Sequence, residues 1–150
     1  MNTKRSIEEF FIHKKFAIAG VSRNPKKFGH RVFTLMKEKG FEIYPINPNI
    51  EQIDNQTYYK DVFSLPDEIN SILILTKPSS TLEVVKQAIE KGIKNIWIQQ
   101  MSHSKEAIEL AQNNNINLIY NACIFMYADP VDGMHKFHRS VYKLFGKLPK

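Results

Sequence analysis

The stretch Phe16-Ala17-Ile18-Ala19-Gly20-Val21-Ser22-Arg23-Asn24-Pro25-Lys26-Lys27-Phe28-Gly29 decides the fold. It begins with a continuous apolar run, turns at a glycine, and ends just before a segment in which Val32, Leu35 and Met36 recur at helical spacing. Strands that are buried on both faces of a parallel sheet have such continuous runs. The stretch therefore predicts a strand, a basic loop and a helix, which together form the first βα unit of a parallel sheet.

Four further apolar runs have the same character. They occupy residues 43–46, 72–75, 96–98 and 118–120. Helical patterns lie between them, and Ser80 and Glu83 have the spacing of a capping box at the start of one helix. Alternating strands and helices predict βαβ units with right-handed crossovers. We therefore expect an α/β fold: a Rossmann-like, doubly wound, mainly parallel five-stranded sheet with helices on both faces.

The remaining segments complete a single domain over residues 1–150. Residues 1–14 are expected to form a leading helix, and residues 51–70 a short edge element and a turn. A closing amphipathic helix is expected at about 132–146. Its apolar stripe is expected to pack on the domain or on a second copy of the chain, so a homodimer stays open.

The composition is that of a globular protein, with 43% hydrophobic and 24% charged residues. The single cysteine, Cys123, excludes an internal disulfide and favours a reducing compartment. No apolar run approaches the roughly 18 residues of a membrane span, and no signal peptide is visible. We expect a cytoplasmic protein with no membrane partner.

The net charge is +6, and its distribution matters more than its sum. No acidic residue lies between Glu9 and Glu38, where seven Lys and Arg residues occur. After Asp132 there are five more basic residues and again no acid. Such segments favour a polyanionic partner, although a solvated basic face has the same appearance. The sequence does not favour nucleic acid as the partner, because no helix-turn-helix, zinc finger or RNP-type motif is present.

The first loop has the features of a phosphate-binding site. Ligands of doubly wound sheets bind at the carboxyl ends of the strands, and a helix start with several cations suits an anion. The G-x-G-x-x-G fingerprint is absent, and Asn47 stands where an NAD site expects an acid. These departures favour a small-molecule nucleotide ligand with more phosphate than NAD, such as NADP or coenzyme A.

The chain resembles the small CoA-binding domain proteins, which are stand-alone relatives of the CoA-binding domain of succinyl-CoA synthetase. The resemblance covers about residues 12–125. It is carried by residues 16–22 with Asn24-Pro25, by Tyr44-Pro45-Ile46-Asn47-Pro48, by Thr76-Lys77-Pro78, by Ile96-Trp97-Ile98-Gln99 and by Asn121-Ala122-Cys123.

The resemblance implies a Rossmann-like fold that holds the nucleotide end of coenzyme A. Backbone amides and Ser22 would hold the pyrophosphate, and nearby cations would neutralise the phosphates. The expected binding residues are Gly20, Val21, Ser22, Arg23, Asn24, Lys26, His30, Arg31, Asn47, Pro48, Thr76, Lys77, Pro78 and Gln99. Many relatives have alanine where this chain has Val21, so the bulkier side chain is expected to narrow the ligand's approach.

We expect binding without catalysis, because no nucleophile–base–carboxylate set is visible among the histidines and no metal site is expected. The alternative is an NAD(P)-binding oxidoreductase or a sensor of NAD(P). Cys123 has two interpretations: a thiol that forms a mixed disulfide with coenzyme A, or a buried structural cysteine.

Overall fold

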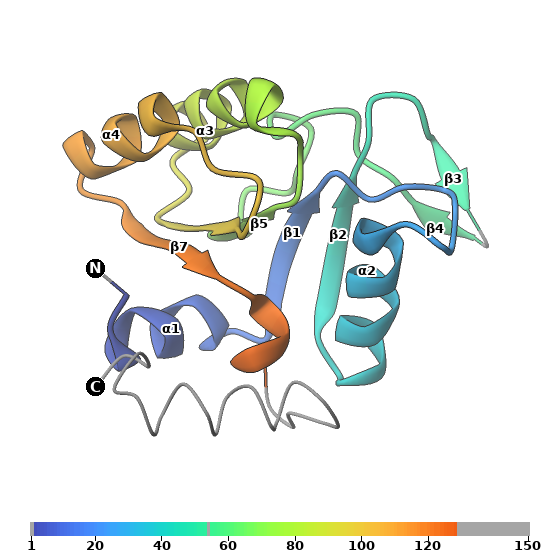
Figure 1. The fold of residues 1–150 in the computed structure, drawn as a ribbon. Helices are drawn as coiled ribbons and strands as arrows, with labels where there is room; N and C mark the ends of the chain where they lie inside the picture. Colours follow the sequence, from blue (N-terminus) through green and yellow to red (C-terminus); the bar gives the residue numbers. More distant parts are fainter. Residues whose placement is uncertain (1, 54, 129–150) are drawn as a thin grey trace.

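The computed structural model describes residues 2–53 and 55–128. Its main sheet has five parallel strands in the order β2-β1-β5-β6-β7 (Figure 1). The strands are β1 (Lys15–Ala19), β2 (Glu42–Ile46), β5 (Ser71–Ile74), β6 (Asn95–Gln99) and β7 (Asn117–Ala122). All five coincide with the apolar runs, so the predicted Rossmann-like, doubly wound sheet is confirmed.

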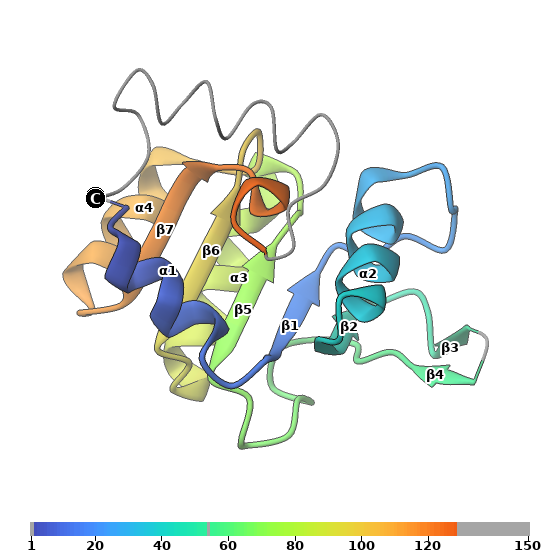
Figure 2. The same cartoon turned by 90° about the horizontal axis from the view of Figure 1, so that it is seen from below.

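Helices cover both faces of this sheet. One face carries α1 and α2, and the other carries α3 and α4 (Figures 1 and 2). The bounds are α1 (Lys4–Phe11), α2 (Phe28–Glu38), α3 (Pro78–Lys91), α4 (Lys105–Asn113) and a 3₁₀ turn, η1 (Ile124–Met126). None of the helices within the described ranges is both long and apolar enough to cross a membrane.

Two apolar clusters hold the layers together, one on each face. Along β1, Phe16 and Ile18 pack in the cluster under α1 and α2, whereas Ala17 and Ala19 pack in the cluster under α3 and α4. Trp97 of β6 joins the first cluster and donates from Nε1 to the Ala122 carbonyl at 3.0 Å. Because successive residues of a strand alternate between faces, a continuous apolar run is what a sheet covered on both sides requires.

The topology reverses between β1 and β5. From β1 the chain first builds β2 on one side, and it later returns to add β5 on the other side of β1. In open α/β sheets, the crevice outside such a switch point is where ligands bind. The candidate ligand site therefore lies among the residues that follow β1, β2 and β5.

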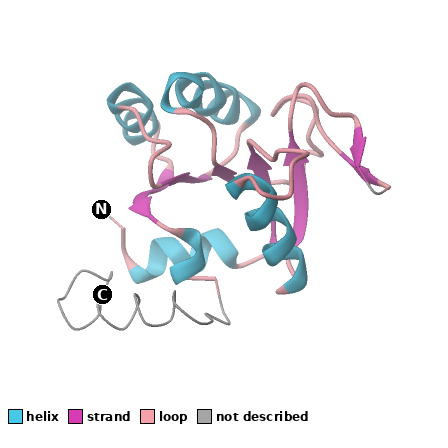
Figure 3. Ribbon diagram, turned by 45° about the vertical axis from the view of Figure 1, so that its right-hand side comes forward, coloured by secondary structure: helices cyan, strands magenta, loops and turns pink. Residues whose placement is uncertain are grey.

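The segment from 51 to 70 holds a two-stranded antiparallel hairpin, β3 (Gln52–Ile53) and β4 (Gln56–Thr57). It projects from the edge of the domain beyond β2 (Figure 3). Tyr59 then forms an isolated parallel bridge with Ile46. These features agree with the short edge element that the sequence predicts.

The helix boundaries agree with the sequence analysis in part. The capping box at Ser80 is wrong, because α3 begins at Pro78 after Lys77, and no side chain caps it. Proline fits the first turn of a helix, where its missing N–H costs nothing, and so the helix starts three residues earlier than expected. The leading helix is confirmed over Lys4–Phe11, and the closing helix at 132–146 lies outside the described residues.

Candidate anion-binding site at the switch point

Gly20 turns the chain sharply off β1. Its φ is +96°, and a Cβ built on it would lie 3.1 Å from the carbonyl carbon of Leu75 and 3.2 Å from the nitrogen of Thr76. The loop after β1 therefore passes directly against the turn after β5, and only glycine fits both the backbone conformation and the space. The first turn of α2 contacts the same loop, because Gly29 lies against the Gly20 carbonyl.

Hydrogen bonds within the loop fix its shape. Asn24 N–H donates to Ser22 Oγ at 3.1 Å, and Lys26 N–H donates to Asn24 Oδ1 at 2.9 Å. Lys27 N–H donates to the Asn24 carbonyl at 3.0 Å. Asparagine side chains favour such local turns, so Asn24 helps to fix the shape of the loop. Its contact with a ligand stays a prediction.

Two side chains join the loop to its neighbours. Asn47, after β2, donates from Nδ2 to the Val21 carbonyl at 2.8 Å. His30, in α2, places Nδ1 at 2.9 Å from the Ser22 carbonyl. The ends of β1 and β2 and the start of α2 thus form one connected site.

A buried threonine of α3 holds the turn after β5 in place. Thr81 is fully buried, and its Oγ1 lies 2.6 Å from the Ser102 carbonyl and 2.9 Å from Thr76 Oγ1. Because a hydroxyl has one proton, a Thr81 that donates to Ser102 accepts from Thr76. The sequence analysis missed Thr81; a polar residue at an otherwise apolar position of the helical repeat was the available signal.

The starts of the helices differ in a way that bears on ligand binding. Thr3 caps α1 and Ser104 caps α4, each by accepting a backbone N–H. The residues at the N-caps of α2 and α3 are Lys27 and Lys77, and neither side chain caps its helix. Uncapped N–H groups and the helix dipole attract anions. The two uncapped starts follow β1 and β5, the strands at the switch point.

Exposed cations surround these helix starts. Arg23, Lys26, Lys27, Arg31 and Lys77 are all exposed. Within residues 2–53 and 55–128 none of the five pairs with a carboxylate, whereas Lys4, Arg5, Lys91 and Lys105 each do. Positive charge that is not neutralised by the protein itself is suited to binding an anionic ligand.

Two of the expected site residues, Val21 and Gln99, are buried. The Val21 side chain is fully buried in the core, so it does not narrow the approach as expected, and its backbone is what the loop uses. Gln99 is 3% exposed, and its Oε1 accepts from Ile124 N–H at 3.1 Å, which ties η1 to β6. Its contact with a ligand stays a prediction. Pro48 and Pro78 are exposed at the same edge.

Cys123 is buried at the carboxyl end of β7, within the core under α1 and α2. This burial favours the structural interpretation over the mixed disulfide, because disulfide exchange needs an accessible thiolate. Across the described ranges, the structure has no cluster of three or more His, Cys, Asp or Glu side chains suited to a metal ion.

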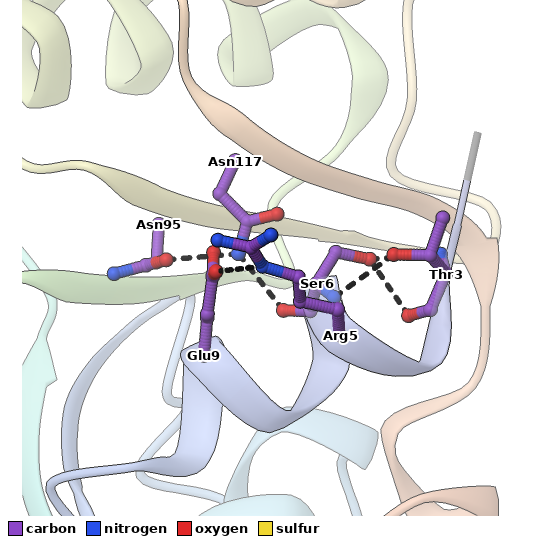
Figure 4. Close-up of polar contacts among 6 residues, drawn as sticks. All are labelled: Thr3, Arg5, Ser6, Glu9, Asn95 and Asn117. Atoms are coloured by element: carbon purple, nitrogen blue, oxygen red, sulfur yellow. Dashed lines mark hydrogen bonds and ion pairs between the residues drawn. The ribbon is translucent and has the colours of Figure 1, made fainter.

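A hollow of about 600 Å³ lies elsewhere, between α1 and the amino end of β7. Several of its polar groups are engaged (Figure 4): Arg5 with Glu9, Ser6 with Thr3, and Asn117 Nδ2 with the Ser6 carbonyl and with Asn95 Oδ1 nearby. The bond from Asn117 to the Ser6 carbonyl attaches α1 to the sheet, whereas the Arg5–Glu9 and Ser6–Thr3 contacts lie within α1 and its N-cap. Much of the polar lining of the hollow thus serves the structure of α1, and the carboxyl ends of the strands remain the candidate site.

The fold is that of a Rossmann-like α/β domain, and the candidate anion-binding site lies at its switch point. Residues 14–129 match the family model described as CoA binding domain, and the chain belongs to that family. The resemblance inferred from the sequence is thereby confirmed.

Relatives of two kinds are similar to this chain. The alpha subunit of acetate–CoA ligase [ADP-forming] II from Pyrococcus furiosus is 27% identical over 79% of this chain, which spans only 28% of that subunit. The uncharacterised protein YneT of Bacillus subtilis is 23% identical, with 74% of this chain and 82% of YneT covered. Among solved structures, a hypothetical protein from Pyrococcus horikoshii OT3 has a TM-score of 0.79 and 31% identity, covering 88% of this chain and 94% of that one.

Proposed function

We propose that this protein binds coenzyme A or an acyl-CoA without catalysing a reaction, and that the ligand's phosphates lie at the loop after β1. One observation carries the proposal: the two helices at the switch point begin uncapped, among cations that the described part of the chain leaves unpaired. Membership of the CoA-binding domain family supports coenzyme A as the ligand.

The expected roles follow from the positions of the groups. Backbone N–H groups of the loop and of the start of α2 would bind the pyrophosphate, with Arg23, Lys26 and Arg31 supplying positive charge. The exposed Pro48 would contact the adenine or ribose end. The turn after β5, with Thr76 and Lys77, would form the opposite wall.

A ligand series tests the proposal by thermal unfolding. Coenzyme A, dephospho-CoA, acetyl-CoA, NAD and NADP are compared at one concentration. A ligand present at 100 times its Kd raises stability by about 2.7 kcal/mol if it binds only the folded state. We expect coenzyme A to stabilise more than dephospho-CoA and NAD to have no effect. Stabilisation by NAD or NADP alone would instead favour the oxidoreductase or NAD(P) sensor.

The absence of catalysis needs its own measurement. Incubation with acetyl-CoA, ATP and ADP, followed by mass analysis of the nucleotides, is expected to return all of them unchanged. Turnover that the purified protein carries out alone would contradict the non-catalytic assignment. A homodimer also stays a prediction, and sedimentation with and without coenzyme A tests it.

A further inference from the structure

The loop after β1 has two consecutive carbonyl groups that accept hydrogen bonds from side chains of other elements. The Val21 carbonyl accepts from Asn47 Nδ2 at 2.8 Å, and the Ser22 carbonyl faces His30 Nδ1 at 2.9 Å. A carbonyl oxygen only accepts, so Nδ1 of His30 carries the proton. Both donors come from outside the loop, one after β2 and one from α2.

These bonds fix the orientation of two peptide planes. In a planar trans peptide, the C=O of one residue and the N–H of the next point in opposite directions. The N–H groups of Ser22 and Arg23 are therefore turned away from Asn47 and His30. In the described part of the chain, neither N–H has a protein acceptor within hydrogen-bond distance. Consecutive backbone N–H groups with no protein acceptor are a common means of binding anions.

We propose that Asn47 and His30 are positioning residues, which hold the Ser22 and Arg23 N–H groups in place for the ligand's phosphates. The proposal rests on the proposed function, because it assumes that the loop binds the phosphates of coenzyme A. Asn47 was expected to bind the ligand directly, whereas in this proposal it acts by holding the loop. The Asn47 side chain contacts the protein at both ends, since its Oδ1 accepts from Asn49 N–H at 2.9 Å.

The proposal also explains why an amide occupies the position after β2. Aspartate has no proton to give to the Val21 carbonyl at neutral pH, and its second oxygen would face the carbonyl oxygen. The loop itself thus requires an amide there, whatever the ligand. A loop held in its binding conformation before the ligand arrives loses less entropy on binding, which raises the affinity.

The first test compares Asn47→Asp with Asn49→Asp, using inorganic pyrophosphate and coenzyme A as probes. Both variants add the same charge after β2, but only the first removes the donor to Val21; the Asn49 side chain is exposed. We expect Asn47→Asp to bind pyrophosphate about 3- to 10-fold more weakly than Asn49→Asp, which is what one net hydrogen bond corresponds to. Equal affinities would overturn the role of Asn47.

The second test uses His30. In asparagine the side-chain nitrogen is the same number of bonds from Cα as Nδ1 is in histidine. His30→Asn is therefore expected to keep the donor and the affinity for pyrophosphate, and His30→Leu to lose both. A loss of affinity in His30→Asn as large as in His30→Leu, with both variants folded, would overturn the role of His30.

Backbone amide NMR gives a readout that a loss of stability alone would not alter. Pyrophosphate should shift the Ser22 and Arg23 amide signals of the unmodified protein, and Asn47→Asp should move the Ser22 signal before any ligand is added. Unshifted Ser22 and Arg23 signals at saturating pyrophosphate would overturn the proposal. If pyrophosphate shifts them and coenzyme A does not bind, the positioning role stands and the proposed function fails.

Discussion

Gly29 lies against the carbonyl oxygen of Gly20, so close that a Cβ on Gly29 would be 2.2 Å from that oxygen. The first turn of α2 and the turn after β1 are therefore in backbone contact. No side chain intervenes that is able to move aside. This contact places the uncapped start of α2 at the end of β1, where the candidate anion site is built.

The first prediction concerns Gly29→Ala. Alanine is the better helix former, so a loss of stability would come from the clash with Gly20. We expect the free energy of unfolding to fall by about 1–3 kcal/mol and the affinity for coenzyme A to fall as well, because α2 must shift away from the loop. Urea unfolding and calorimetry measure the two effects.

Gly40→Ala is the matched control for that variant. Gly40 has φ +89° and no neighbouring atom within 4 Å of an added Cβ, and it follows the other end of α2. Alanine there costs backbone strain but does not touch the site. An equal loss of affinity in Gly40→Ala would show that general destabilisation, and not the position of α2, weakens binding.

The second prediction concerns Lys91, whose Nζ donates to the Phe63 and Leu65 carbonyls and lies 3.0 Å from Asp67 Oδ1. Its side chain is 15% exposed, whereas that of Asp67 is fully exposed. Lys91→Met leaves one partly buried carbonyl without its donor, and we expect a loss of about 1–3 kcal/mol. Asp67→Asn should leave stability nearly unchanged, because exposed ion pairs contribute little. Comparable losses from both variants in urea unfolding would contradict this account.

The third prediction concerns the titration of Tyr44, whose hydroxyl donates to Glu42. That hydrogen bond, with burial and the nearby negative charges, raises the pKa of Tyr44 from 10.0 to about 12. The unfolded chain ionises at the ordinary value, so this stabilisation is complete below pH 10 and is lost as the pH rises from about 10 to about 12.

Absorbance of the phenolate during a pH titration measures this directly. The titration of one tyrosine near pH 12 should disappear in Tyr44→Phe, and the Tyr44 midpoint should move down towards 10 in Glu42→Gln. A titration of Glu42→Gln identical to that of the unmodified protein would show that Glu42 does not cause the shift.

The sheet was predictable from the sequence because each strand is an apolar run bounded by turn residues. β5 is the clearest case, since all four of its residues are buried. The sequence also placed the candidate site at one edge of the sheet, because parallel strands bring their carboxyl ends together; ligand binding there stays a prediction. The turn at Gly20, which the sequence predicted, is present in the structure, and the cations after it are exposed.

The contacts within the site could not be predicted in the same way. A sequence does not show that Val21 turns its side chain into the core, or that Asn47 donates to the Val21 carbonyl, since both depend on the path of the loop. The start of α3 was misplaced for a related reason. The serine at position 80 has capping-box spacing, but Pro78 already fits the first turn.

The last prediction concerns the cations that follow β1. Arg31 is exposed in the first turns of α2, and Lys86 is exposed in α3, away from the switch point. Arg31→Gln should weaken coenzyme A binding by about 1.5- to 5-fold at low salt, the range that an exposed charge pair contributes. Lys86→Gln removes the same charge and should have no effect.

Added salt tests whether the contribution of Arg31 is electrostatic, and Lys86→Gln separates a local contact from a general attraction. The screening length is about 10 Å at 0.1 M and about 3 Å at 1 M ionic strength. The difference between Arg31→Gln and the unmodified protein should therefore shrink as salt is added, and calorimetry at both ionic strengths measures it. If Lys86→Gln weakened binding as much as Arg31→Gln at low salt, net charge would account for the attraction, and the cations of the first loop would have no particular role.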